Sequence, residues 1–175
     1  MPSGKAVQPL VYVDSCVYLD LVTKNSDEHA DTGEERWRSA KAVFDAVNEN
    51  DLRLASSSLV EAEVCCNGEA RRDKERIRIL LSGWFTARST EWVEIDRYLA
   101  REAVRLTNVW QGQGENGKRM SAADALHLAA ALRLGADFFM THDGGFPNGQ
   151  RLDGMLVTRP DVVWQESLLR HAAGE

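Results

Sequence analysis

Short apolar runs that alternate with longer helical patterns are the feature that most constrains the fold of this chain. The first run, Leu10-Val11-Tyr12-Val13, is continuous and partly β-branched, as expected of a strand buried on both faces. Similar runs predict further strands at residues 52–55, 92–95, 138–141 and 155–157. Helical patterns fill the intervening segments, at residues 15–21, 33–48, from 57 onward, 69–87, 96–110 and 121–134. This alternation predicts an α/β fold around a mainly parallel sheet.

The length and composition suit one domain. The 175 residues, 43% of them hydrophobic, can bury a sizeable core. We expect a single domain over residues 1–175, with its core at residues 10–160, a short flexible N-terminus and an additional C-terminal tail. The polar, glycine-containing segment 111–117 predicts a mobile loop.

No stretch approaches the ~18 apolar residues that a membrane span requires, and residues 1–8 lack the apolar run of a signal peptide. We therefore expect a cytoplasmic protein with no membrane partner. Three cysteines, Cys16, Cys65 and Cys66, are an odd number without CxxC spacing. Reduced thiols are favoured over a disulfide framework or a zinc knuckle.

The net charge of −6 argues against a generally basic nucleic-acid binder, but an acidic metal site would also make the total more negative. The distribution of charge is therefore more informative than its sum. Residues 71–78 hold five basic and two acidic side chains. Arg72 and Arg76 in this cluster are candidates for binding RNA phosphates, and a solvated helix face laced by Asp73 and Glu75 is the alternative.

Two aspartates directly follow predicted strands. Asp14 ends the first apolar run, and Asp143 follows the fourth within Thr141-His142-Asp143-Gly144-Gly145. Each has an ordinary structural explanation, as a helix cap for Asp14 and as a turn residue for Asp143. However, parallel strands place their carboxyl ends at one edge of the sheet, where ligand sites form. The two carboxylates are therefore predicted to converge.

Glu63 is the third candidate acid. A helical wheel that starts at Leu59 places Glu63 near the middle of a broad apolar face and Glu61 on the opposite side. A carboxylate on such a face needs a cation or a hydrogen-bond partner, because its unpaired burial is costly. Glu61 has a sufficient structural explanation, since its spacing from Ser58 is that of a capping box.

Asp124 is the fourth candidate acid. Ser121 and Asp124 also have capping-box spacing, which explains Asp124 as a structural residue. The alanine-rich segment that follows, residues 125–131, predicts a helix packed closely on the sheet. Asp124 would then lie at the helix entrance beside the acids at the strand ends, where capping and metal binding are compatible.

A cluster of carboxylates makes physical sense when divalent cations bind it. At ~4 Å a like-charged pair costs about 1 kcal/mol in water and roughly 4 kcal/mol at an intermediate dielectric. Oxygen ligands favour hard ions such as Mg²⁺ or Mn²⁺. These ions activate water and stabilise the attacking and leaving oxygens of a phosphodiester, which makes phosphodiester hydrolysis the natural hypothesis.

Four segments in this order resemble the PIN-domain family, which includes the VapC-type toxin ribonucleases. They are VYVDS at 11–15, SSLVEAEV at 57–64, SAADALHLA at 121–129 and FMTHDGGF at 139–146. The resemblance spans residues 10–160 and implies a three-layer fold with a five-stranded parallel sheet. It places the family's catalytic, metal-binding acids on Asp14, Glu63, Asp124 and Asp143, and a hydroxyl residue beside the site, a candidate for substrate binding, on Thr141.

The same resemblance implies a Mg²⁺- or Mn²⁺-dependent endoribonuclease that is the toxin of a VapBC-type toxin–antitoxin pair. Its implied partners are an RNA substrate, a cognate antitoxin protein and a second copy of the chain in a homodimer. The chain is longer than the compact toxins at residues 23–35, 111–117 and after 164, which bears on the toxin role more than on the chemistry.

Other functions remain as alternatives. A non-catalytic PIN-like module that binds RNA or protein is the main one, although all four acids are present. A phosphatase that uses Asp14 as a nucleophile would need a second aspartate where the chain has Cys16, and a receiver domain would need adjacent acids after its first strand. We interpret His127 as a packed histidine rather than a general base. His142 could contact substrate, but an exposed turn explains it equally well.

Overall fold

A parallel sheet with β1 near its centre organises the molecule. The structure, a computed structural model, describes residues 8–68 and 74–161. Within these residues the sheet has six strands in the order β3-β2-β1-β4-β6-β5. They are β1 (Leu10–Val13), β2 (Arg53–Ser57), β3 (Glu91–Val93), β4 (Phe138–Met140), β5 (Arg151–Leu152) and β6 (Met155–Thr158). All neighbours are parallel except β5 and β6, which confirms the predicted α/β fold with a mainly parallel sheet.

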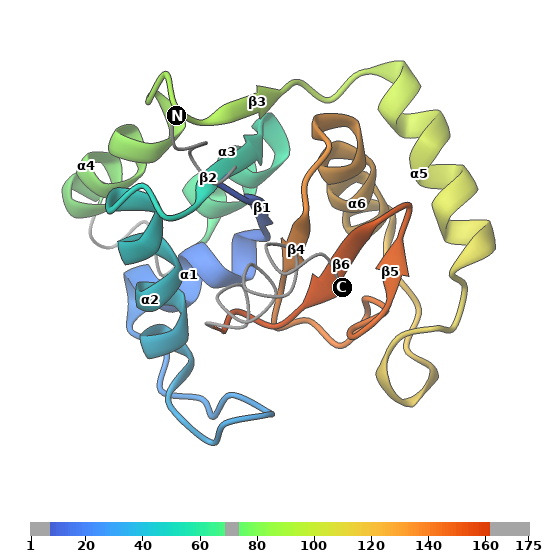
Figure 1. The fold of residues 1–175 in the computed structure, drawn as a ribbon, viewed down its shortest axis with the longest axis horizontal. Coiled ribbons are helices and arrows are strands. Elements are labelled where there is room, and N and C mark those ends of the chain that lie inside the picture. The colour runs from blue at the N-terminus through green and yellow to red at the C-terminus, as the bar shows by residue number, and fades with distance from the viewer. Residues whose placement is uncertain (1–7, 69–73, 162–175) are drawn as a thin grey trace, which may run out of the picture.

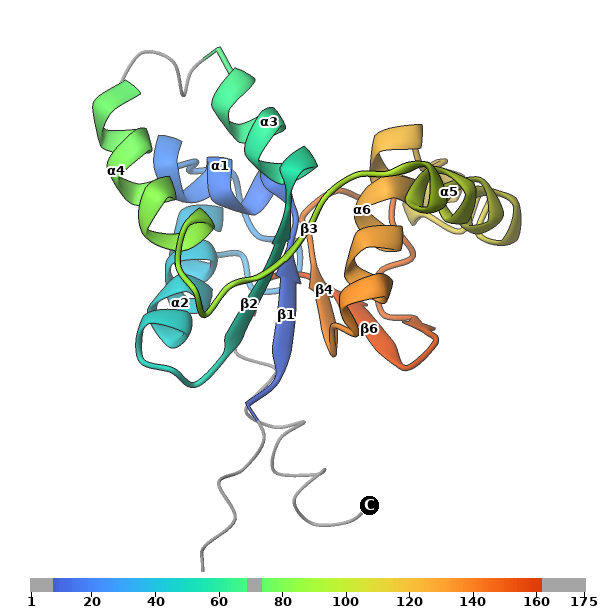
Figure 2. The same ribbon diagram turned by 90° about the horizontal axis from the view of Figure 1, so that it is seen from above.

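Helices lie on both sides of this sheet, in three layers (Figure 2). The helices are α1 (Ser15–Thr23), α2 (Arg36–Asn48), α3 (Ser58–Cys66), α4 (Lys74–Phe85), α5 (Arg97–Val109) and α6 (Ala122–Leu134). In Figure 1 and Figure 2, α1, α2 and α4 lie on one side and α5 and α6 on the other, while α3 continues from the end of β2. No helix in these described ranges is long and apolar enough to cross a membrane.

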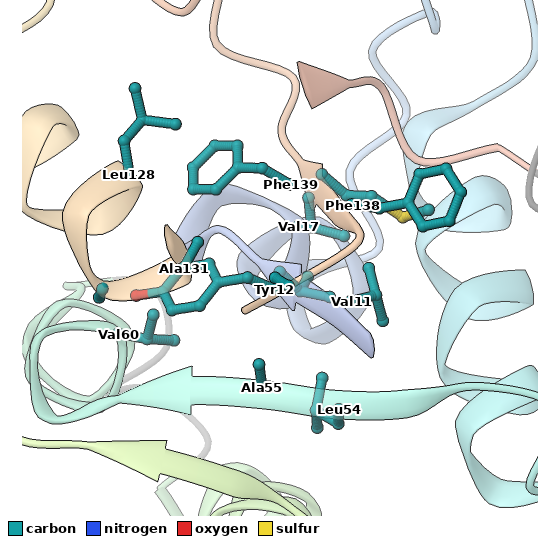
Figure 3. Packing of buried hydrophobic residues seen from close by; sticks show 14 of the residues in the cluster. Val11, Tyr12, Val17, Leu54, Ala55, Val60, Leu128, Ala131, Phe138 and Phe139 are labelled. Carbon is teal, nitrogen blue, oxygen red and sulfur yellow. The ribbon is translucent and has the colours of Figure 1, made fainter. Parts of the chain in front are cut away.

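Burial on both faces explains the continuous apolar run of β1. All four of its side chains are buried, and the strand hydrogen-bonds to β2 on one side and β4 on the other. Tyr12 stacks on Phe139 with their ring centroids 5.5 Å apart. Figure 3 shows this part of the core, where Val60 and Ala131 lie near Tyr12. The small side chains of α6 bring that helix close to the sheet.

Polar side chains begin several of the helices. Asp14 caps α1, Asp96 caps α5, and Ser121 with Asp124 forms the capping box predicted for α6. The capping box predicted from Ser58 and Glu61 is wrong. The cap of α3 is Ser57, whose Oγ accepts a hydrogen bond from the Val60 backbone, because β2 extends to Ser57 and α3 begins at Ser58, so that Ser58 lies inside the helix.

The number of strands and the start of α2 differ from the predictions because of local backbone geometry. The sheet has six strands instead of five, since Asp153 and Gly154 adopt positive φ angles and reverse the chain into a hairpin of β5 and β6. Helix α2 begins at Arg36 rather than near Gly33, which has φ +70° and lies within a turn closed by a bridge between Glu28 and Glu35.

The predicted mobile loop at residues 111–117 is held in place by several contacts. It contains a short 3₁₀ turn, η2 (Glu115–Gly117). The Glu115 backbone N–H donates to the Gly144 carbonyl at 2.7 Å, and the Glu115 side chain accepts hydrogen bonds from Asn148 and Arg159. These contacts join the loop to the segment that follows β4 and to Arg159, which follows β6.

Candidate metal centre

Asp14 lies where β1 ends and α1 begins, and it is 5% exposed. Its Oδ1 accepts a hydrogen bond from the Ser15 backbone at 2.7 Å, and its Oδ2 accepts one from Thr141 Oγ1 at 2.7 Å. Cys16 Sγ also lies 3.2 Å from Oδ2. Burial raises the pKa of Asp14, and nearby His127 and these donors only partly offset that effect. The site therefore holds a carboxylate that would be stabilised by a positive charge.

Glu63 reaches the same place from α3. Its Oε2 accepts a hydrogen bond from Ser15 Oγ at 2.6 Å and lies 2.9 Å from His127 Nε2. The hydrogen bond with His127 lowers the pKa of Glu63 despite partial burial. The choice of Glu63 over Glu61 agrees with this geometry, since Glu61 is exposed. The broad apolar face was overestimated, because Ala62 and Cys66 are exposed and the Glu63 side chain is itself 32% exposed.

His127 completes this group from α6. It is 1% exposed, and its Nε2 lies 3.8 Å from Asp14 Oδ1. One ligand atom from each of Asp14, Glu63 and His127 can be chosen so that all three lie within 4.8 Å of one another. Burial alone would lower the pKa of His127, but the hydrogen bond to Glu63 and the charge of Asp14 outweigh burial and raise it.

Asp124 and Asp143 both lie close to Gly145. A Cβ added to Gly145 would lie 3.2 Å from Asp143 Oδ1 and 3.6 Å from Asp124 Oδ2. Asp124 is held by the capping box, in which the Ser121 N–H donates to its Oδ2 at 2.7 Å. The charge of Asp124 also acts on His127. Within residues 8–68 and 74–161, the group whose ligand atoms lie within 4.8 Å of one another holds Asp14, Glu63 and His127, and it does not include Asp124 or Asp143.

Asp143 has a basic partner of its own. Lys118 Nζ donates to Asp143 Oδ1 at 2.5 Å, and the Gly145 N–H donates to the same oxygen at 2.7 Å. Burial favours the neutral carboxyl of Asp143, but Lys118 and Gly145 outweigh burial and lower its pKa. An exposed lysine thus supplies a positive charge next to this acid.

Thr141 lies beside the acids, as the family resemblance implied. Its hydroxyl donates to Asp14 Oδ2, and the Asp143 backbone N–H donates to Thr141 Oγ1 at 2.9 Å. The residue is completely buried, so its hydroxyl orients two acids from within the protein. The structure does not describe the side chains that were predicted to bind RNA phosphates. Arg72 and the side chain of Arg76 lie outside the described residues.

The structure confirms that His127 is packed and contradicts the exposed-turn alternative for His142. His127 is packed, as expected, but the contacts with Glu63 and Asp14 were missed. His127 lies three residues after Asp124, on the same face of the helix. This spacing was the signal that could have placed His127 near the acids. His142 was interpreted as an exposed turn residue equally well as a substrate contact, yet it is buried, with its ring packed on His29 at 5.0 Å. Burial, and to a smaller extent the neighbouring His29, lowers the pKa of His142 to about 3.

The donor set fits a divalent cation. The carboxylates of Asp14 and Glu63 converge from separate elements, and the buried Asp14 would be favoured in its charged form by a nearby cation. Asp124 and Asp143 add carboxylate oxygens at the margin of the same edge. Oxygen-rich sites of this kind bind Mg²⁺ or Mn²⁺ in proteins.

Comparisons with solved structures show the same fold. A toxin–antitoxin complex from Klebsiella pneumoniae has a TM-score of 0.55 at 18% identity, covering 83% of this chain and 95% of that chain. VapBC2 from Rickettsia felis, bound to a DNA fragment from its promoter, has a TM-score of 0.57 at 16% identity, covering 87% and 99%. VapC20 of Mycobacterium tuberculosis, a toxin that cleaves the sarcin–ricin loop, has a TM-score of 0.52 at 16% identity, covering 77% and 90%.

No curated protein matches the chain significantly. The family model of the PIN domain, in contrast, matches residues 11–152, a range that contains all four predicted acids. Since this match covers most of the sequence and the fold agrees with it, the chain belongs to the PIN domain family.

Proposed function

We propose that this protein is a metal-dependent endoribonuclease that hydrolyses RNA phosphodiester bonds at Asp14, Glu63, Asp124 and Asp143. One observation carries the proposal: acids from distant parts of the chain meet at the carboxyl edge of a parallel sheet, where Asp14 and Glu63 share a small space with His127. Burial raises the pKa of Asp14 despite its hydrogen bonds, so a bound cation would favour its charged form. Divalent cations at such a site are suited to phosphoryl chemistry.

The chain's own residues would hold and orient this centre. A bound Mg²⁺ or Mn²⁺ would supply an activated water and neutralise charge on the phosphodiester. Thr141 and Ser15 donate hydrogen bonds to Asp14 and Glu63, respectively, and would hold these carboxylates in place as ligands. Asp124 and Asp143 would extend the acidic edge toward the substrate. Lys118, which donates a hydrogen bond to Asp143, would contact a phosphate oxygen of the RNA once it releases Asp143.

We further propose that the nuclease is the toxin of a VapBC-type pair. The support is the likeness to VapBC2 and to a Klebsiella toxin–antitoxin complex, together with the likeness to VapC20, which cleaves the sarcin–ricin loop. A cognate antitoxin would then bind and inhibit the protein, and a homodimer would be its functional form. Copurification of an inhibitory protein with the tagged chain from its native cells tests the antitoxin.

The nuclease activity is tested by mapping RNA ends. Purified wild-type protein is incubated with structured RNA in Mg²⁺, Mn²⁺ or EDTA, and new 5′ ends are sequenced. Asp14→Asn and Glu63→Gln remove ligand charge while preserving shape, and each should reduce cleavage on the order of 100-fold or more. Glu61→Gln is the matched control, because Glu61 is exposed on the same helix.

Cleavage that persists in both ligand variants, or in EDTA, would contradict the proposed site. Absence of cleavage by the wild type in either ion, with no effect of metal on its stability, would instead favour the non-catalytic binding module. The control variant must cut like the wild type for either conclusion to hold.

A further inference from the structure

The environment of His127 is unusual for a packed histidine. Its imidazole is almost fully buried, yet its Nε2 faces Glu63 Oε2 at 2.9 Å and Asp14 Oδ1 at 3.8 Å. An ordinary core histidine needs one partner for each ring nitrogen, whereas this Nε2 faces two acids. The ring edge is therefore aimed at the space that the two carboxylates share.

We propose that His127 Nε2 is a third metal ligand beside Asp14 and Glu63, and that the site therefore prefers a transition-metal dication such as Mn²⁺ to Mg²⁺. This inference rests on the metal centre of the proposed function and deepens it, because the acids alone do not predict a nitrogen ligand. It assigns a metal-binding role to a residue that the acidic quartet leaves out.

The spacing of the three ligand atoms suits a common ion. Two ligands about 2.1 Å from one ion stand about 3.0 Å apart at right angles and about 3.6 Å apart at 120°. The observed separations of Nε2 from the Glu63 and Asp14 oxygens are 2.9 Å and 3.8 Å. The separation from Glu63 fits neighbouring positions in one coordination shell, and that from Asp14 is slightly longer than the 120° value, so a small side-chain movement would bring all three atoms into one shell.

The other side of the ring has the partner that a ligating histidine requires. His127 Nδ1 lies 3.0 Å from the hydroxyl of Tyr12, which lies 2.7 Å from Ser57 Oγ. Both of these residues are fully buried. With a proton on Nδ1, the imidazole donates to Tyr12 and Tyr12 donates to Ser57, which leaves the Nε2 lone pair facing the acids. A second hydrogen bond of this kind typically fixes the tautomer of a metal-bound histidine.

The rival arrangement reverses this chain of hydrogen bonds. Tyr12 would then donate to Nδ1, and Nε2–H would donate to Glu63, so that His127 would only orient a ligand. The two arrangements differ in whether nitrogen binds the ion. Imidazole favours transition metals over Mg²⁺, which takes oxygen ligands, so metal preference also distinguishes them.

Electron spin-echo spectroscopy of bound Mn²⁺ tests the proposal directly and needs no RNA. Mn²⁺ is added to the metal-free full-length protein at substoichiometric amounts, with natural and ¹⁵N-histidine-labelled samples in parallel. We expect a directly coupled ¹⁴N signal that changes to ¹⁵N on labelling. In His127→Gln this coupling should disappear and the Kd for Mn²⁺ should rise about 10-fold or more, while the preference for Mn²⁺ over Mg²⁺ shrinks.

Tyr12→Phe is the companion variant, because it keeps the aromatic ring and removes only the hydroxyl that contacts Nδ1. It should retain the ¹⁴N coupling and weaken Mn²⁺ binding about 10-fold. If His127→Gln fails to fold, the labelled wild type still decides the question.

Stoichiometric Mn²⁺ binding without nitrogen coupling in the wild type would overturn the proposal and leave His127 as a positioning residue. Failure to bind Mn²⁺ at all would overturn both this inference and the metal centre. Nitrogen coupling in a protein that cleaves no RNA would contradict the nuclease function alone.

Discussion

The two carboxylate oxygens of Asp14 make different contacts. One carboxylate oxygen caps α1 through the Ser15 backbone, and the other accepts a hydrogen bond from Thr141 across the sheet. The first contact is local and follows from the sequence. The second joins residues 127 positions apart and depends on the neighbouring position of β1 and β4.

Replacing Asp14 with Asn should stabilise the metal-free protein at neutral pH. Because burial raises the pKa of Asp14 in the folded state above its unfolded value of about 3.9, the folded protein binds this proton more tightly. The contribution of this proton to folding stability is fully present below the pKa of the unfolded state. It is lost as pH rises through the pKa of the folded state. Above that window the ionised wild type carries a cost that a neutral Asn lacks, on the order of 1 kcal/mol per pKa unit.

Urea unfolding in EDTA between pH 4 and 8 measures this difference. The advantage of Asp14→Asn over the wild type should grow with pH and then level off. An advantage that is independent of pH, or a variant that is less stable at pH 7, would show that buried Asp14 is compensated without a metal.

The buried Thr141 hydroxyl should matter for both stability and metal binding. Thr141→Val keeps the shape but removes the donor to Asp14 and the acceptor for the Asp143 N–H. We expect a loss of about 1–3 kcal/mol, measured by chemical denaturation, and weaker Mn²⁺ binding, measured by calorimetry. Thr107→Val is the matched control, because the Thr107 hydroxyl bonds only to the Ala103 carbonyl within α5. Equal effects of the two substitutions would refute the role of Thr141.

At the scale of elements, helices with a long sequence pattern could be predicted, whereas short strands and loops could not. The capping box and the alanine-rich pattern located α6, whose Gly135 cap has φ +69°. Strand β5 has too few residues to show alternation, and its hairpin depends on positive φ angles at Asp153 and Gly154. The loop at residues 111–117 was expected to be mobile because its contacts with Gly144, Asn148 and Arg159 come from distant parts of the chain.

The close packing of this loop makes Gly114 a sensitive position. A Cβ on Gly114 would lie 2.5 Å from the Lys118 carbonyl oxygen and 2.6 Å from that of Gly144, closer than side chains tolerate. Gly114→Ala should therefore separate the loop from the segment that carries Asp143. We expect a loss of about 1–3 kcal/mol in unfolding free energy and weaker metal binding.

Gly83→Ala in α4 is the control for this substitution, because nothing lies within 4 Å of its Cβ position. It should leave metal binding unchanged and stabilise the protein by up to ~1 kcal/mol through helix propensity. Unchanged metal binding in Gly114→Ala would show that the loop does not support the site.

At the scale of the whole molecule, parallel topology explains why acids from three separate regions converge. Strands β1 and β4 are neighbours and both end beside the site, while α3 follows β2 on the other side of β1. The strand-end rule therefore predicted the acidic edge from Asp14 and Asp143. It could not predict that Glu63 pairs with His127, or that Lys118 pairs with Asp143, since side-chain partners depend on how α6 and the loop pack on the sheet.

The central claim is that the acidic edge binds a divalent cation, and a thermal melt with and without Mn²⁺ tests it most directly. At ~100 times its Kd, Mn²⁺ should stabilise the wild type by about 2.7 kcal/mol, which raises Tm by roughly 5–10 °C. Asp14→Asn and Glu63→Gln should lose most of this shift, and Glu61→Gln should keep it. No shift in the wild type, or an equal shift in all four proteins, would contradict the account.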